Sequence, residues 1–136
     1  MIIDKETKIK LLKAAYEAKE YAYAPYSNFS VGAALLTKEG RIFTGCNIEN
    51  ASYGATNCAE RTAIFKAISE GERDFLALAI VSDFSGYTFP CGICRQVISE
   101  FSKEFQVIFQ NNKGEILSLS VKDLFPYPFN EKDLVK

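Results

Sequence analysis

The first part of the chain repeats apolar and charged positions with a helical period. Between residues 4 and 23, leucines and alanines recur every three or four positions, with lysines and glutamates on the opposite side. This pattern predicts an amphipathic helix, which Pro25 ends. Residues 75–81, in contrast, form a continuous apolar run, which is typical of a strand buried on both faces of a sheet.

Four shorter apolar segments are separated by turn residues. They predict two β-hairpins, one on either side of the long apolar run in the sequence. Their bounds are 31–36 and 41–46, which turn at Glu39-Gly40, and 106–110 and 115–119, which turn at 111–114.

Two more helices are predicted, each beginning beside a cysteine. The first has Asn57 as its cap and ends at Gly71. Its apolar face is expected to contain Ala59, Ala63, Ile64, Ala67 and Ile68. The second follows Cys91, with Val97, Ile98 and Phe101 on its core side, and the chain from Val121 onward is predicted to be short helix and loop.

The predicted order is helix, strand, strand, helix, strand, helix, strand, strand. Such an order is typical of an α/β fold in which helices cover both faces of one mixed sheet. We therefore predict a single domain, residues 1–136, with three α-β-α layers around a mixed five-stranded sheet.

Charge narrows the class of partner. Charged residues make up 24% of the chain and hydrophobic residues 48%, an ordinary balance for a globular protein, and the net charge is −1. A protein that binds nucleic acid through phosphates should be basic, so we expect a small neutral or weakly charged substrate and no nucleic acid partner.

The N-terminus carries charged residues too early for a secretory signal, and no apolar run is long enough to span a membrane. We therefore expect a cytoplasmic protein without a membrane partner, in which reduced cysteines indicate metal binding more than disulfides. The chain contains no histidine, which excludes histidine-based nucleophilic catalysis and histidine metal ligands.

Three cysteines have the spacing of a metal centre. Cys91 and Cys94 form a Cys-x-x-Cys pair, and Cys58 can supply a third sulfur. Three protein ligands leave the fourth position of a tetrahedral zinc ion open to water, as in catalytic sites. Glu60 follows Cys58 by two residues and could take that water's proton.

The predicted helix starts favour thiolates, because backbone N–H groups and the helix dipole stabilise negative charge there. Two arginines, Arg61 and Arg95, are placed to donate to thiolate sulfur, although a surface salt bridge is the simpler interpretation of either one.

Other interpretations of these residues stay open. Asn57 and Glu60 have the spacing of a capping box, in which the glutamate only bonds a helix-start N–H. Cys46 could be a fourth ligand that closes the site into a structural zinc of a non-catalytic binding module. The Cys-x-x-Cys pair could also be a redox motif, but Cys58 would then have no role.

Taken together, several motifs resemble those of the small, single-domain cytidine deaminases. The resemblance extends from residue 23 to about residue 129, and its motifs are Phe29–Leu35, Cys46–Tyr53, Cys58–Arg61 and Pro90–Gln96. It implies a cytidine deaminase-like fold and zinc-dependent hydrolytic deamination of cytidine and 2′-deoxycytidine, with release of ammonia, in pyrimidine salvage. It also implies a homotetramer with one Zn2+ per subunit and active sites at subunit interfaces.

The resemblance also implies roles for individual residues. Glu60 would be the catalytic proton shuttle, and Cys58, Cys91 and Cys94 the zinc ligands. The substrate-binding residues would be Asn47 and Glu49 at the ribose hydroxyls, Phe29 beside the nucleoside, Ala59, and Phe129, which would reach the base in a neighbouring subunit. Arg61, which would neutralise thiolate charge, and Tyr53 would support the site.

One alternative within the same fold is a deaminase of a cytosine-containing antibiotic nucleoside. The Asn47-x-Glu49 pair argues against it, because these side chains suit the hydroxyls of an unmodified ribose.

Overall fold

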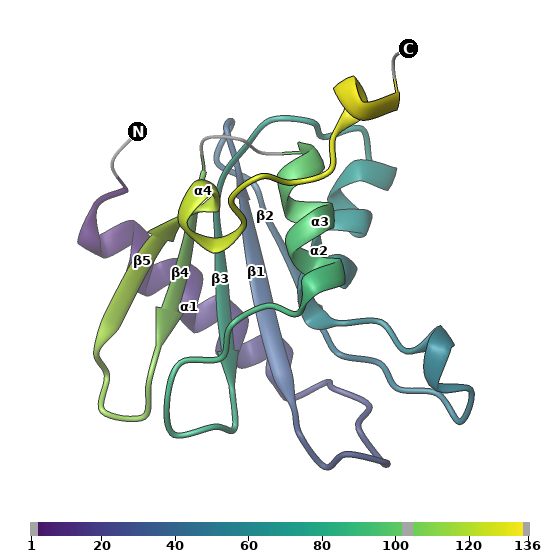
Figure 1. Cartoon of the computed structure of the whole chain (residues 1–136). Helices are drawn as coiled ribbons and strands as arrows, with labels where there is room; N and C mark the ends of the chain where they lie inside the picture. The colour runs from purple at the N-terminus through teal and green to yellow at the C-terminus, as the bar shows by residue number, and fades with distance from the viewer. Residues whose placement is uncertain (1–2, 102–104, 135–136) are drawn as a thin grey trace.

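A mixed five-stranded sheet lies at the centre of the molecule, with the strand order β2-β1-β3-β4-β5 (Figure 1). The computed structural model describes residues 3–101 and 105–134. Strand β3 pairs with β4 in parallel, and the other neighbouring strands are antiparallel. The predicted fold class and strand order along the chain are confirmed. The strands are β1 (Val31–Thr37), β2 (Ile42–Cys46), β3 (Phe75–Ser82), β4 (Gln106–Gln110) and β5 (Ile116–Ser120).

Helices cover both faces of this sheet. Helix α1 (Lys5–Lys19) crosses behind the strands in Figure 1, and α2 (Ala59–Ser69) and α3 (Gly92–Phe101) lie on the other face. The short helix α4 (Val121–Leu124) follows β5, and two single turns, η1 (Tyr53–Ala55) and η2 (Glu131–Leu134), complete the described elements. Within the described residues, no helix is both long and apolar enough to cross a membrane.

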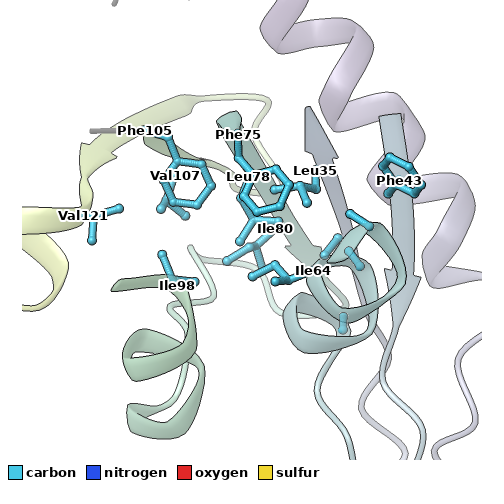
Figure 2. Close-up of a cluster of buried hydrophobic side chains, with 14 of the residues drawn as sticks. Leu35, Phe43, Ile64, Phe75, Leu78, Ile80, Ile98, Phe105, Val107 and Val121 are labelled. Atoms are coloured by element: carbon cyan, nitrogen blue, oxygen red, sulfur yellow. The ribbon is translucent and has the colours of Figure 1, made fainter. Parts of the chain in front are cut away.

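Two layers of apolar side chains hold the helices to the sheet. Figure 2 shows the layer under α2 and α3, where Ile64 and Ile98 meet side chains from the strands. The second layer packs Leu11 and Leu12 of α1 against the opposite face. Residues of β3 alternate between the two layers, with Leu78 in the first. This confirms that the long apolar run is a strand buried on both sides.

Helix α1 is shorter than the sequence pattern predicts. It begins after Asp4, whose Oδ1 accepts from the backbone N–H of Thr7 at 2.8 Å, and it ends at Lys19 instead of residue 23. The backbone of Tyr23 leaves the helix to pair with the chain that follows β2. Its N–H donates to the carbonyl of Asn47 at 3.0 Å, and its carbonyl accepts from Glu49 N at 2.8 Å. These bonds replace those of a further helical turn.

Two glycines let the helices approach the sheet closely. A methyl group at Gly45 in β2 would lie 2.5 Å from both the carbonyl oxygen of Ala59 and the backbone nitrogen of Ala63 in α2. A methyl group at Gly32 in β1 would lie 2.0 Å from the carbonyl oxygen of Ala15 in α1. No side chain fits at either position, so α2 is held directly against β2.

Candidate active site

Helix α2 begins after Cys58, which has extended backbone angles of φ −76° and ψ 156°. Asn57, which the sequence predicts as the cap, does not occupy this position, so that prediction is wrong. Asn57 instead pairs with Ile48 in a β-bridge, in which each backbone N–H donates to the other carbonyl at 2.9 Å, and its side chain donates to Oγ1 of Thr62. The capping-box interpretation of Glu60 fails too, because the backbone N–H of Asn57 is already bonded.

Two further cysteines lie at the start of α3. Cys91 immediately precedes the helix and Cys94 lies in its first turn. The Sγ atoms of Cys58, Cys91 and Cys94 all lie within 4.8 Å of one another, and those of Cys58 and Cys91 are 3.9 Å apart. Cys46 is also a free cysteine, but it is not a member of this cluster. The structure therefore brings together three sulfurs and not four.

The cluster has an uneven distribution of charge. A hydrogen bond from Cys94, together with one from Arg61, lowers the pKa of the Cys58 thiol to about 5 against the opposing effect of burial. The hydrogen bond with Cys58 and burial raise the pKa of the Cys94 thiol. Sulfurs this close cannot all carry negative charge unless a cation lies among them, because like charges repel strongly at short range.

The donor set fits one zinc ion. Zinc binds cysteine sulfur at about 2.3 Å, so two sulfurs on one tetrahedral ion are separated by roughly 3.8 Å. The 3.9 Å between Cys58 and Cys91 agrees with this spacing. A dication would stabilise all three thiolates, and three protein ligands leave one position open.

Glu60 lies next to the sulfur cluster but is not part of it. Its side chain faces the protein interior, with an exposed fraction of 5% for the residue. Burial raises the pKa of its carboxyl group to about 7, since the charged form loses its hydration, and the negative charge of Cys58 adds to this effect. A carboxyl group with a pKa near neutrality can both accept and donate a proton.

The two arginines of the cysteine motifs have different roles. Arg61 donates from Nη2 to Sγ of Cys58 at 3.2 Å, as expected. Arg95 does not donate to sulfur, and the expectation that it would is wrong. Its Nε donates to the carbonyl of Pro90 at 2.8 Å and its Nη1 to the carbonyl of Leu124, so it joins the metal-site turn to the C-terminal segment.

Three of the predicted substrate residues lie together. Asn47 is buried, and its side chain accepts from Val31 N at 2.9 Å and donates to the carbonyl of Phe29 at 2.8 Å. Glu49 accepts through Oε1 from the backbone N–H groups of Tyr26 and Ser27, at 2.9 and 3.1 Å. The segment that carries Phe29, residues 26–31, is therefore bonded to the side chains of both Asn47 and Glu49.

The other predicted site residues are less closely connected. Ala59 is fully buried in the core. The ring of Tyr53 is largely exposed and packs edge-on against Tyr26, with 6.1 Å between centroids. The backbone carbonyl of Phe129 accepts from the side chain of Gln96 at 2.7 Å, while its ring is exposed.

Comparison with known proteins agrees with this geometry. The family model described as the cytidine and deoxycytidylate deaminase zinc-binding region matches residues 5–110. The chain belongs to this family. A cytidine deaminase of Sporosarcina psychrophila is 52% identical over 126 residues, which cover 92% of this chain and 93% of the relative.

Solved structures of the family have the same fold. The crystal structure of cytidine deaminase from Burkholderia pseudomallei matches with a TM-score of 0.86 and 48% identity, over 93% of this chain and all of that one. A blasticidin-S deaminase of Bacillus cereus is less similar, at 31% identity over 129 residues, which cover 89% of this chain and 91% of the relative.

Several residues that hold this family's motifs in place were not selected from the sequence. The hydroxyl of Thr62 lies 3.0 Å from the carbonyl of Cys46 and 3.1 Å from that of Cys58, joining the end of β2 to the start of α2. Asp83 accepts from the backbone N–H of Ser30 at 3.0 Å and from Lys19 Nζ at 2.9 Å. Apart from the bond between Thr62 and Cys58, these bonds join residues distant in sequence, and no local pattern indicates them.

Proposed function

We propose that the chain deaminates cytidine and 2′-deoxycytidine to uridine and 2′-deoxyuridine with release of ammonia, as a step of pyrimidine salvage. The observation that carries this proposal is the position of Glu60, a buried carboxyl group beside a three-cysteine cluster. A cluster of three thiolates suits a zinc ion with one open position, and a carboxyl group that is not a ligand can move protons there. The relatives named cytidine deaminase support the choice of substrate.

Glu60 would transfer protons in both halves of the reaction. When bound, zinc supplies an activated water at the open position. As the water oxygen bonds to C4 of the pyrimidine, Glu60 takes a proton from it and gives this proton to ring N3. Glu60 then takes the remaining hydroxyl proton and gives it to the exocyclic nitrogen, so that the bond from C4 to this nitrogen breaks and ammonia leaves. A pKa of about 7 suits both steps.

Asn47 and Glu49 would bind hydroxyl groups of the sugar. In the described structure Asn47 keeps one N–H and one lone pair for a ligand, because the amide uses one of each for Phe29 and Val31. Ionised Glu49 can only accept, so it suits a hydroxyl donor. Phe29 is 37% exposed and would lie beside the nucleoside.

We further propose that the chain works as a homotetramer of single-domain subunits (residues 1–136), with active sites at subunit interfaces. The exposed rings of Tyr53 and Phe129 support this, because aromatic side chains are enriched at protein interfaces. Arg61 would offset the negative charge of the three thiolates. A cytoplasmic location fits a site of reduced cysteines.

The two alternatives have less support. A closed structural zinc would need Cys46 in the sulfur cluster, and it lies outside that cluster. Deamination of an antibiotic nucleoside is favoured only by the less similar relative.

Ultraviolet absorbance provides the test. The zinc-loaded protein is mixed with cytidine, 2′-deoxycytidine or blasticidin S, and conversion of the cytosine chromophore is followed. We expect rapid conversion of both nucleosides and slow or no conversion of the antibiotic. Faster conversion of the antibiotic would overturn the proposed substrate, and conversion of none of them by protein with one zinc per chain would overturn the proposed activity.

A further inference from the structure

The carboxylate of Glu49 is bonded by one short segment of the chain. Besides the two backbone N–H groups on Oε1, its Oε2 accepts a hydrogen bond from the hydroxyl of Ser27. Ser27 is therefore bonded to both carboxylate oxygens, through its N–H and its hydroxyl. A carboxylate offers about four acceptor positions, and three are occupied here. The remaining position is on Oε2, beside the Ser27 hydroxyl.

The same hydroxyl also holds Phe29. The backbone N–H of Phe29 donates to Oγ of Ser27 at 3.1 Å. The intervening residue, Asn28, has a φ of 57°, a left-handed conformation that asparagine adopts more readily than most residues. This turn brings Phe29 N back to the serine, so one hydroxyl donates to Glu49 and accepts from Phe29.

Glu49 and Ser27 line a common cavity. It has a volume of about 250 Å³ and lies beside the loop that follows β2. Its lining residues are Tyr26, Ser27, Glu49, Asn50, Tyr53 and Thr56. The side chain whose acceptor position is free and the serine that bonds it thus belong to the wall of one cavity.

We propose that Ser27 is a positioning residue that fixes the Glu49 carboxylate and thereby sets how strongly the site selects for a sugar hydroxyl. This inference rests on the proposed role of Glu49 in binding the sugar. Without the serine hydroxyl, the Oε1 bonds remain, but Oε2 loses the partner that fixes its direction. Both acceptor positions of Oε2 are then free and the oxygen has no fixed direction, so it no longer points consistently at the substrate.

The predicted effect is specific to one substrate group. In Ser27→Ala, kcat/KM for cytidine should fall about tenfold, the size expected for a lost hydrogen bond to a charged group, and the change should appear mainly in KM. For 2′,3′-dideoxycytidine, which lacks the 2′- and 3′-hydroxyls, the change should be less than about twofold. Ser27→Thr keeps the hydroxyl and should restore most of the selectivity.

A double-mutant cycle with Glu49→Ala tests whether Ser27 acts through Glu49. All variants are purified with zinc, and their metal content and Tm are compared with the original protein. Ser85→Ala is the matched control, since this exposed serine's hydroxyl makes no hydrogen bond to another described residue. In the Glu49→Ala background, adding Ser27→Ala should change cytidine kcat/KM by less than about twofold.

Two results would overturn the proposal. One is equal slowing of cytidine and the dideoxy analogue by Ser27→Ala, which would mean that the serine only supports the loop. The other is a full tenfold loss in the Glu49→Ala background, which would show that Ser27 acts independently of Glu49. If Glu49→Ala alone leaves the discrimination between cytidine and the dideoxy analogue unchanged, the proposed sugar-binding role of Glu49 is wrong. That result comes from Glu49→Ala and not from Ser27→Ala, so the two failures can be distinguished.

Discussion

The guanidinium Nη2 of Arg61 lies 3.2 Å from Sγ of Cys58, three residues earlier in the chain. The Nε of the same arginine is buried and has no hydrogen-bond partner among the described residues. Arg61 lies in the first turn of α2, and its guanidinium group reaches back to the sulfur of the residue that precedes this helix. Three thiolates with one zinc ion carry a net negative charge, and in the proposed function Arg61 would offset it without occupying a ligand position.

We expect one zinc ion per chain, bound by three sulfurs and one lighter atom. X-ray absorption at the zinc edge reports both the number and the kind of ligand. Cys58→Ala, Cys91→Ala and Cys94→Ala should each lose zinc, while Cys46→Ser should keep it, because Cys46 lies outside the sulfur cluster. A spectrum that shows four sulfur ligands would instead support the alternative of a closed structural zinc site.

The Glu60→Gln variant should fold and bind both zinc and nucleoside, yet lose nearly all turnover. Removing a proton shuttle costs about a hundred- to ten-thousandfold in rate, and one that serves two steps should fall at the upper end. Turnover is measured by absorbance and nucleoside binding by calorimetry. A variant that keeps its activity but has a lower Tm would show that Glu60 has only a structural role.

The Gly45→Ala variant should lower stability and activity together. The added methyl group meets backbone atoms of α2 at 2.5 Å, and overpacking of this kind costs about 1–3 kcal/mol. Thermal unfolding should show a lower Tm, and the shifted helix should also reduce zinc content.

Gly54→Ala is the control for that experiment, since a methyl group there meets no atom within 4 Å. Its Tm should stay close to that of the original protein. Full zinc content and activity in Gly45→Ala would mean that α2 can move away from β2 without disturbing the metal site.

Loss of the sugar hydroxyls should reveal the role of Glu49. Cytidine and 2′-deoxycytidine should both react well, because both carry the 3′-hydroxyl. The 2′,3′-dideoxy analogue should lose about 2–4 kcal/mol of transition-state stabilisation, tens- to several-hundredfold in kcat/KM. In Glu49→Ala most of this difference should disappear. Equal slowing of cytidine and the analogue would indicate that Glu49 only shapes the loop.

Free nucleosides should be much better substrates than cytidine monophosphate or single-stranded oligonucleotides. The net charge of −1 offers no excess of positive charge to attract phosphates. Rates on the three substrate types, measured at two salt concentrations, check this expectation. Comparable activity on an oligonucleotide that falls steeply with salt would contradict it.

The sequence predicts those parts of the fold that depend on local periodicity. The buried strand β3, the two hairpins and the apolar face of α2 follow from which positions are apolar, since burial requires that pattern. The end of α1 was predicted too late because Tyr23 bonds to residues beyond β2, and no local signal indicates that pairing.

The same distinction holds for the site. The cluster of Cys58, Cys91 and Cys94 could be predicted, because zinc sites use only a few kinds of ligand residue and these occur in typical sequence spacings. The partner of Arg95 could not be predicted, since it depends on where the carbonyl of Leu124 lies after folding. Nor could the contacts of Ser27 with Glu49, which join residues 22 positions apart.

The bond between Gln96 and the carbonyl of Phe129 has a consequence for assembly. Association of proteins is weakened by the entropy lost when mobile segments become ordered at the interface. In this chain the backbone at Phe129 is already fixed to α3, so assembly of the proposed tetramer has only the exposed aromatic ring left to immobilise at this residue. The C-terminal segment is thus preorganised by the same helix that carries Cys94 and begins directly after Cys91.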